Sequence, residues 1–513
     1  MHSNMTPDNF GTEEMALFCK SKGFIYLNSE IYGGLKGFFD YGSLGSEMKK
    51  NLKDSWWKFH VQDREDIVGI DGSIITHPKV WEASGHAANF ADVMVEDTKT
   101  GEKHRADVLI EDQANIAADG LSAEQMWNII QEKKITSPAG NPLAMPEHFN
   151  LMFSTHVGPK SDKENIAYLR PETAQLMFVN FRQIVENARL KLPFGIAQIG
   201  KAFRNEISPR NFLFRCREFE QMEIEYFIHP QDSNNCPYLK EVSNHKIRIY
   251  DAAMQSKDTG EGETMSMQEA IDAGIIKTQW HAYWLATEHQ WFISLGAKAD
   301  NFRIRQHVAT EKSHYALDTW DLEYKFPWGW KELQGMANRT DFDLQQHMKH
   351  SGKDLSLFDE EKKEKVVPHV VAEPSQGVDR AFLVFMFDAY EDDKERGNIV
   401  LHLSPSLAPI KIGVFPLVNK LNEQAREVFA QIQKEWTCQY DRSGSIGRRY
   451  ARADEIGIPF CVTVDFDYIE KGTLTIRDRE STKQAVIKKE QLKEALRKLL
   501  NGTPLEEIET VKP

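Results

Sequence analysis

The stretch that decides the fold reads Phe203-Arg204-Asn205-Glu206, then a polar turn, then Phe214-Arg215-Cys216-Arg217-Glu218-Phe219-Glu220-Gln221-Met222-Glu223-Ile224-Glu225-Tyr226. Side chains alternate between the two faces of a β-strand. A strand over 214–226 therefore places on one face Arg215, Arg217, Phe219, Gln221, Glu223 and Glu225. Such a face offers cations to phosphates, an aromatic ring to a flat base and carboxylates to an ammonium group. Since Arg204 and Glu206 share a face of the preceding strand, the hairpin predicts a nucleotide site; the alternative is a solvated edge hairpin.

These residues resemble motif 2 of the class II aminoacyl-tRNA synthetases, in which Phe-Arg-Asn-Glu is followed by an arginine, here Arg215, and four residues later by Phe219. The longer string over 199–211 is similar to the dimeric type of glycyl-tRNA synthetase, and the resemblance extends from about Gly34 to about Arg479. It implies an α+β fold: a class II antiparallel sheet flanked by helices, with a C-terminal α/β anticodon-binding domain. The implied activity is the attachment of glycine to tRNA(Gly) through a glycyl-adenylate, by a homodimer that uses ATP and Mg²⁺.

The resemblance also implies roles for the residues of the ATP site. Arg204 would contact the α-phosphate, Glu206 the adenine edge, Arg215 the γ-phosphate, and Phe219 would stack on the base. Arg380 resembles the motif 3 arginine, so Arg204 and Arg380 are the expected catalytic residues, and Glu332 is expected to contact ATP and Mg²⁺. The full expected ATP site comprises Arg204, Asn205, Glu206, Phe214, Arg215, Cys216, Arg217, Glu218, Phe219, Glu332, Leu333, Gly377, Val378, Asp379 and Arg380.

Elementary chemistry supports these residue types. Activating a carboxylate with ATP is a displacement at the α-phosphorus, which needs positioning and neutralisation of developing charge. Arginines meet that need at phosphates, and carboxylates hold magnesium. Arg380 stands at the start of an apolar helix, where a cation opposes the helix dipole, so stability alone would not select it.

Glycine recognition must act through the ammonium and carboxylate groups and through lack of space, because glycine has no side chain to hold. The resemblance assigns the glycine site to Arg105, Glu172, Phe219, Glu220, Gln221, Met222, Glu223, Glu373, Ser375 and Gly377. Among these, a lone loop arginine such as Arg105 is more often a surface residue.

Composition narrows the class of protein. The five cysteines are scattered without a Cys-x-x-Cys pair, which argues against a disulfide framework and against a structural zinc site. The longest apolar run, residues 381–387, is too short to span a bilayer. The first 20 residues include Asp8, Glu13 and Glu14 and show no signal-peptide pattern. We therefore expect a cytoplasmic protein without a membrane partner.

The net charge of −14 argues against a nucleic-acid partner, but its distribution weakens that objection. From Ser404 onward the chain carries 18 Lys and Arg against 16 Asp and Glu, so the acidic excess lies before this point. The expected tRNA contacts are Arg442, Arg448, Arg449 and Arg452, which lie in one basic segment near aromatic residues. Arginines beside aromatics suit single-stranded RNA loops.

At 513 residues the chain is long enough for two or more domains. We expect a catalytic domain over 1–403, with insertions at about 95–165 and 230–274, a linker over 404–409, and an α/β domain over 404–513. The spacing of Leu44, Met48, Leu52, Trp56 and Phe59 predicts an amphipathic helix, which in the resembled family is motif 1 and contributes to the dimer interface. Strands are expected over 316–324, 328–334, 411–415, 460–466 and 473–477, and a helix over 422–433.

Two other functions stay open from the sequence. One is a synthetase-like ligase that activates another small amino acid, and the other is a non-catalytic paralogue that binds nucleic acid. The retained arginines and glutamates of the expected ATP site argue against the second. His347 and His350 suggest a metal site, but they stand in a charged stretch without matching partners, so we expect solvated histidines.

Overall fold

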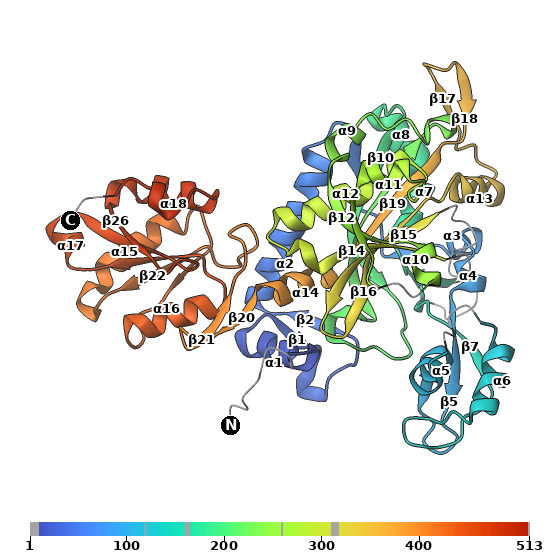
Figure 1. Cartoon of the computed structure of the whole chain (residues 1–513), viewed down its shortest axis with the longest axis horizontal. Coiled ribbons are helices and arrows are strands. Elements are labelled where there is room, and N and C mark those ends of the chain that lie inside the picture. Colours follow the sequence, from blue (N-terminus) through green and yellow to red (C-terminus); the bar gives the residue numbers. More distant parts are fainter. Residues whose placement is uncertain are drawn as a thin grey trace.

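A nine-stranded sheet forms the centre of the molecule in the computed structural model, which describes residues 10–116, 118, 121–159, 165–257, 260–308 and 318–510 (Figure 1). Its strands, in spatial order, are β13 (Glu263–Ser266), β12 (Lys246–Tyr250), β14 (Phe302–Gln306), β15 (Thr319–Phe326), β16 (Gly329–Ala337), β19 (His369–Gly377), β11 (Glu218–Ile228), β10 (Phe194–Phe203) and β3 (Ile67–Gly69). The six strands from β14 to β10 pair antiparallel, whereas β12 with β14 and β10 with β3 are parallel. The expected class II antiparallel sheet is confirmed.

The alternation of β11 sorts its side chains between two environments. Met222, Ile224 and Tyr226 are fully buried in the main hydrophobic cluster, with Tyr226 packed on Trp280 at a ring-centroid distance of 4.9 Å. That face is covered by α12 (Gln279–Ser294) and α14 (Val378–Ala389). Phe219, Gln221 and Glu223 point the other way. One face of the sheet is thus a core. On the opposite face α7 (Ala174–Val179) packs against part of β10 and β11, and the remainder is left for a site.

The first part of the motif 2 hairpin departs from the expected strand. Residues Phe212–Phe214 form a 3₁₀ turn, entered through Asn211 and Phe212 with φ of 57° and 54°, and β11 begins only at Glu218. Leu213 and Cys216 are buried at 2% and 6% exposure, so their packing pulls this segment out of the extended conformation. Arg215 and Arg217 therefore come from a loop, and the prediction of a strand from residue 214 is wrong.

The amphipathic helix predicted from Leu44 to Phe59 is present as α2 (Ser43–Trp57), which a π-helical turn extends over Lys58–Gln62. Met48, Leu52 and Trp56 are fully buried and contribute to the main hydrophobic cluster. Helix α2 packs against α14, the helix whose first turn contains Arg380.

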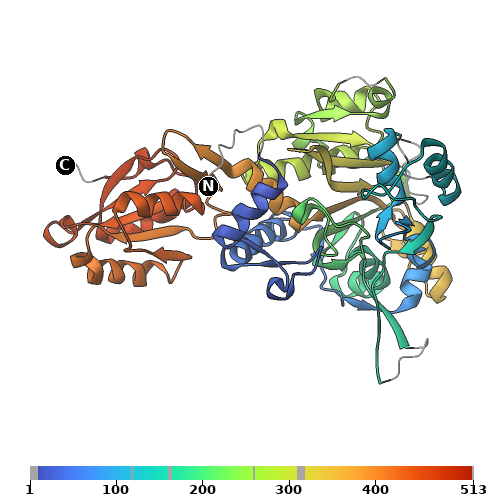
Figure 2. The ribbon, with the colours of Figure 1, turned by 90° about the horizontal axis from the view of Figure 1, so that it is seen from below.

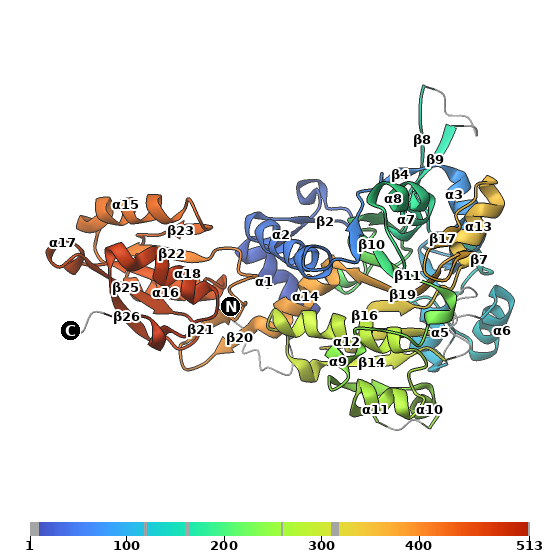
Figure 3. The ribbon, with the colours of Figure 1, turned by 90° about the horizontal axis from the view of Figure 1, so that it is seen from above.

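The first expected insertion is largely a small unit with its own hydrophobic core, set apart from the central sheet (Figure 1). Its elements are β5 (Ala91–Glu96), β6 (Lys103–Arg105), β7 (Glu147–Asn150), α5 (Ala106–Ala114) and α6 (Ala123–Lys133). The hairpin of β8 (Ser154–His156) and β9 (Ile166–Leu169) projects from the body (Figure 2 and Figure 3). The second expected insertion supplies β12 and β13, which extend the edge of the central sheet.

The remaining elements of the N-terminal part are short. They are α1 (Thr12–Lys22), β1 (Ile25–Leu27), β2 (Phe39–Tyr41), β4 (Ile75–Thr76), α3 (Pro78–Ala83), α4 (His86–Asn89), α7 (Ala174–Val179), α8 (Phe181–Ala188), α9 (Leu239–Val242), α10 (Ala252–Ser256), α11 (Met267–Asp272), α13 (Phe342–Ser351), β17 (Leu357–Asp359), β18 (Glu364–Val366), β20 (Tyr390–Asp393) and β21 (Asn398–Leu401). The expected strand over 316–324 corresponds to β15; residues 316 and 317 lie outside the described residues.

The C-terminal domain is a separate α/β unit at one end of the molecule (Figure 1). Its sheet has the order β23 (Cys438–Tyr440), β22 (Ile412–Pro416), β24 (Phe460–Val464), β25 (Thr473–Asp478) and β26 (Gln484–Lys488). The first three strands are parallel, which places their carboxyl ends at one edge. Its helices are α15 (Asn422–Ile432), α16 (Ile446–Glu455), α17 (Asp467–Glu470) and α18 (Leu492–Leu500). The expected α/β fold of this domain is confirmed.

The segment between the two parts is packed. Leu407 and Ala408 are fully buried in the main hydrophobic cluster of the N-terminal part. Arg479 of the C-terminal domain donates to the Leu403 carbonyl at 2.6 Å, and Arg396 donates back to the Arg479 carbonyl at 2.8 Å. The domain boundary near residue 404 stays a prediction, and polar contacts cross it. No helix among the described residues has the length and apolarity needed to cross a membrane.

Candidate active site

A cavity of about 290 Å³ opens on the face of the central sheet opposite α12 and α14. The predicted site residues that line it are Glu172, Arg204, Glu206, Phe214, Arg215, Cys216, Phe219, Gln221, Glu223, Glu332, Leu333, Glu373, Ser375, Gly377, Asp379 and Arg380. They come from β11, β16 and β19, from the loops before β11, and from the start of α14. Residues far apart in the sequence are thus gathered at one cavity.

One part of the cavity carries three arginines beside aromatic rings. Arg204 donates from Nε to the Pro171 carbonyl at 3.0 Å, and its guanidinium lies 5.3 Å from the Phe219 ring centroid. Within the described structure no carboxylate lies within ion-pair distance of Arg204, so its charge faces the cavity. Arg380 donates to the Phe214 carbonyl at 3.2 Å, with its guanidinium 4.4 Å from the Phe214 ring. Backbone anchors therefore hold both guanidinium groups in place for an anionic ligand.

Two glutamates pair with the arginines Arg215 and Arg380 in this part of the cavity. Arg215 donates to Glu206 at 2.7 Å, and Arg380 lies 3.3 Å from a carboxylate oxygen of Glu332. A ligand phosphate would compete for these arginines, whereas Glu332, whose side chain is half exposed at 52%, could turn to a metal ion.

Sequence reasoning missed a second carboxylate close to Glu332. Asp321, on the neighbouring strand β15, also lines the cavity and lies 2.7 Å from His307 Nε2. Burial raises the pKa of Asp321 to about 6, and the negative charge of Glu332 adds to this effect. The adjacent strands β15 and β16 bring the two carboxylates together, a donor set that suits Mg²⁺. Nothing in the local sequence of either residue indicated this pairing.

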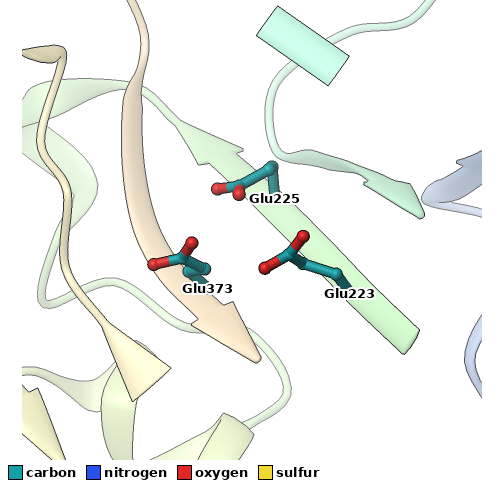
Figure 4. A group of neighbouring side chains, drawn as sticks. All are labelled: Glu223, Glu225 and Glu373. Carbon is teal, nitrogen blue, oxygen red and sulfur yellow. The ribbon is translucent and has the colours of Figure 1, made fainter. Parts of the chain in front are cut away.

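The other part of the cavity is acidic. Glu223 accepts a hydrogen bond from Thr173, and Glu373 accepts one from Arg339 at 2.6 Å. Glu223, Glu225 and Glu373 form a buried group in which one carboxyl oxygen of each residue lies within 4.8 Å of the other two (Figure 4). Such a concentration of carboxylates is suited to an ammonium ion.

Burial and mutual repulsion set the protonation of these acids. Burial raises the pKa of Glu223, and the nearby Glu172 raises it further. Burial likewise raises the pKa of Glu373, which Arg339 only partly offsets. Burial also opposes ionisation of Glu172, but His86, 3.1 Å away, and Arg339 hold its pKa well below the usual value. A bound ammonium group would favour the ionised forms of all three.

Arg339 is the cation of this pocket and was missed from sequence. It lies just after β16, lines the cavity, is buried at 3% exposure, and donates to Asp343 at 2.7 Å as well as to Glu373. His86 was missed too. Neither residue stands in a motif, and only the fold brings them to the acidic pocket.

Several predicted residues do not line the cavity with their side chains. On β11, Glu218, Glu220 and Met222 face the opposite side: Glu220 pairs with Lys49 at 3.1 Å, and Met222 is core. Strand alternation turns these side chains away from the cavity, so their assignment to the ligand site stays a prediction that concerns their backbone alone. Three other predicted residues also lack a side chain in the cavity lining. Val378 is buried in the core, and the backbone N–H of Asn205 donates to the Leu151 carbonyl. Arg217 donates to the Glu206 and Lys36 carbonyls.

Asp379 touches the cavity but is part of a buried network behind it. It accepts hydrogen bonds from Tyr41, from Lys49 at 3.2 Å and from the backbone N–H of Glu220 at 2.8 Å. This network links β2, α2, β11 and α14. We interpret Asp379 as a support for the neighbouring Arg380.

Arg105 does not line the cavity. It pairs with Asp107 and donates to Asp92 at 2.8 Å, and Asp92 in turn lies 3.9 Å from Arg215. Arg105 thus reaches the arginine-rich part of the cavity only through Asp92.

The four arginines expected to bind tRNA differ in their surroundings. Arg442 and Arg448 are exposed, and Arg452 pairs with Asp441 at 3.0 Å. Arg449 is 4% exposed and donates to the carbonyls of Pro416, Gly444 and others, so it holds two loops together. The expectation that Arg449 contacts RNA is corrected by its burial.

The two histidines of α13 also differ from each other. His347 is buried, with Nε2 2.8 Å from Gln175 Oε1, whereas His350 is exposed.

Known proteins match both parts of the chain. The family described as the tRNA synthetase class II core domain (G, H, P, S and T) matches residues 155–386, and the anticodon binding domain matches residues 411–499. A glycine–tRNA ligase of Acetivibrio thermocellus is 43% identical over 94% of this chain and 96% of the relative. Those of Caldanaerobacter subterraneus subsp. tengcongensis and Geobacillus thermodenitrificans are each 43% identical over 95% of this chain, and over 98% and 97% of their own lengths.

Proposed function

The chain belongs to the glycine–tRNA ligase family of class II synthetases, and from that membership we propose that its cavity forms glycyl-adenylate and that the glycyl group then passes to tRNA(Gly). The observation that carries the proposal is the division of a single cavity into two chemical halves. Arginines and Phe219 stand in one half, and Glu172, Glu223 and Glu373 stand in the other. A molecule of ATP and a glycine laid end to end would meet complementary groups along the cavity.

In the first step, a carboxylate oxygen of glycine attacks the α-phosphorus of ATP, and the bond to the β-phosphate breaks. Arg204 and Arg380 neutralise charge that develops on the phosphate oxygens, for which their backbone anchors have already oriented them. Pyrophosphate leaves with the electron pair of the broken bond, next to Arg215. No covalent bond to the enzyme forms.

The carboxylates of Glu332 and Asp321 are the groups that would hold Mg²⁺. Both are hard oxygen donors on adjacent strands, which fits this ion. When bound, the ion neutralises negative charge on the ATP phosphates. His307, in contact with Asp321, orients that carboxylate.

The acidic half of the cavity binds the ammonium group of glycine through Glu172, Glu223 and Glu373, with Ser375 beside them. Gln221 donates to Ser375 at 3.2 Å, which fixes the hydroxyl next to the ammonium site. A side chain larger than hydrogen would collide with walls that backbone hydrogen bonds and buried ion pairs hold in place. Exclusion by lack of space discriminates against alanine more strongly than an oversized pocket could.

The second step needs the tRNA. Its terminal ribose hydroxyl attacks the carbonyl carbon of glycyl-adenylate, and AMP leaves. We assign anticodon binding to the edge of the C-terminal domain where β22, β23 and β24 end. Arg442 and Arg448 are exposed there, and the loops after β22 and β24 add the half-exposed Val418 and Phe466, at 38% and 48%. Cations beside apolar and aromatic groups suit splayed RNA bases.

We also propose that the protein is a homodimer that works in the cytoplasm. The β1–β2 segment exposes Ile31, Tyr32 and Leu35 at 88%, 87% and 50%, a group of large apolar side chains that a second copy would cover. All five cysteines are free thiols, as in proteins of reducing compartments.

Pyrophosphate exchange against a panel of amino acids tests this function. Glycine should support exchange, and alanine and serine should be poor substrates. Equal catalytic efficiency with alanine would replace the glycine specificity with a ligase for another small amino acid. Absence of exchange with every amino acid, combined with intact tRNA binding, would support the non-catalytic paralogue; neither the cavity nor the relatives favour it.

A further inference from the structure

Glu225 is an acidic residue that the proposed reaction does not use. It lies on β11 two residues after Glu223, on the same face, and is fully buried. Neither of its carboxyl oxygens has a hydrogen-bond partner among the described residues. Figure 4 shows its carboxyl group close to those of Glu223 and Glu373, and one carboxyl oxygen of each residue lies within 4.8 Å of the other two.

The groups around Glu225 come from four elements and are mostly acidic. Its own strand supplies Glu223, and β19 supplies Glu373. Asp343 on α13 and Arg339 after β16 complete the surroundings. Arg339 donates to Asp343 at 2.7 and 3.0 Å and to Glu373 at 2.6 Å, so its positive charge is paired with these two acids. Carboxyl groups outnumber the cation.

Closely spaced buried carboxyl groups cannot all be ionised, so at least one must retain a proton. Hydrogen bonds decide which, because a donor to a carboxylate stabilises its charged form. Glu223 accepts a hydrogen bond from Thr173, and Glu373 accepts one from Arg339. No group in the part of the chain that the structure describes donates to Glu225, and burial, reinforced by the charge of Glu373, raises its pKa well above the usual value.

We propose that Glu225 is a positioning residue of the ammonium pocket: it stays protonated, and its O–H points into the space that it shares with Glu223 and Glu373. The O–H of the neutral acid has no partner among the described residues, and we infer that it donates a hydrogen bond to one of these carboxylates when glycine is bound. It holds them in place without adding a third negative charge to repel them. This role rests on the proposed glycine activation; the protonation of Glu225 does not.

The test compares Glu225→Gln with Glu225→Leu in pyrophosphate exchange by the full-length protein. Glutamine is neutral and retains a donor, as a protonated glutamate does. The KM of the Glu225→Gln variant for glycine should therefore stay within about threefold of wild type, since the side chain keeps a hydrogen-bond donor and stays neutral. Leucine removes the donor to a charged group, worth ~1.5–3 kcal/mol, so the KM for glycine should rise by roughly 10- to 100-fold. The KM for ATP should change little in both variants.

A matched control uses another buried glutamate. Glu288 on α12 is fully buried, lies 2.8 Å from His60 and does not line the cavity. Glu288→Gln and Glu288→Leu should affect thermal stability but leave the KM for glycine unchanged. This pair separates an effect on the pocket from a general effect of altering a buried acid.

Two kinetic outcomes would overturn the proposal. If glutamine raises the KM for glycine as much as leucine does, an ionised Glu225 is what the pocket needs. If leucine leaves the KM for glycine unchanged, Glu225 positions nothing.

Infrared spectroscopy gives a second measurement that does not depend on activity or on the folding of the leucine variant. The wild-type minus Glu225→Gln difference spectrum at neutral pH should contain the C=O stretch of a protonated carboxylic acid. A carboxylate band in its place would refute the protonated state, even if the protein proved inactive with glycine. Failure of the proposed function would instead appear as absent exchange in the wild type.

Discussion

Replacing Arg449 by alanine should destabilise the C-terminal domain, although this arginine lies in the most basic segment of the chain. Its guanidinium is buried at 4% exposure and donates to the Gly444 carbonyl at 3.1 Å, to the Ser445 and Leu417 carbonyls at 3.4 Å and to the Pro416 carbonyl. These contacts tie the loop after β22 to the loop before α16. The alanine variant would leave the carbonyls of both loops without their shared donor.

The size of the effect follows from those contacts. A hydrogen bond that involves a charged group is worth ~1.5–3 kcal/mol. Two of the four contacts are long, and water can reach loop carbonyls once the side chain is gone, so we expect a loss of about 3 kcal/mol. For a domain of roughly 100 residues each kcal/mol lowers the Tm by about 4–8 °C, which predicts a shift of about 12–24 °C.

Scanning calorimetry of the full-length protein measures this shift in the transition of the C-terminal domain. Arg448→Ala is the matched control, because its side chain is exposed one residue away. It should change stability by less than about 0.5 kcal/mol, yet weaken tRNA binding and flatten its salt dependence by about 0.7 in slope for one lost phosphate contact. An unchanged Tm in Arg449→Ala together with weaker tRNA binding would refute the structural role. Normal charging by Arg448→Ala at low and high salt would count against the RNA-binding surface.

Three other outcomes test the catalytic assignment. Arg204→Ala should raise the barrier to adenylate formation by ~2.7–4 kcal/mol with little loss of stability, and exchange within about threefold of wild type would contradict its assignment. Glycine should be activated far better than alanine, and the assay is the ratio of catalytic efficiencies in pyrophosphate exchange. Deleting the chain from Ser404 onward should leave glycyl-adenylate formation while tRNA charging falls sharply, because every cavity residue precedes that point. The truncated protein should melt earlier, since the main hydrophobic cluster loses Leu407 and Ala408, and Arg396 and His402 lose their partners on Arg479 and Glu480. Loss of adenylate formation in a folded truncation would show that the boundary is misplaced.

Local patterns sufficed for the parts of this protein that depend on neighbouring residues. The period of Leu44 to Phe59 predicted α2, because an amphipathic helix repeats every 3.6 residues wherever it packs. The alternation along β11 separated Phe219, Gln221 and Glu223 from the buried Met222 and Ile224, because strand geometry allows no other arrangement. The motif resemblance then placed Arg204 and Arg380 at the same cavity, although 176 positions separate them in the sequence.

The tertiary structure decided whatever depends on which elements meet. Asp321 and Arg339 line the cavity because β15, β16 and β19 pair side by side, and neither residue stands in a motif that would have indicated a site. Arg448 and Arg449 are adjacent in the sequence, yet one is exposed and the other buried, since successive residues of a helix point about 100° apart and only one direction faces the loop after β22. Charge and residue type can be read from a sequence, whereas burial and partners arise only when distant segments pack against each other.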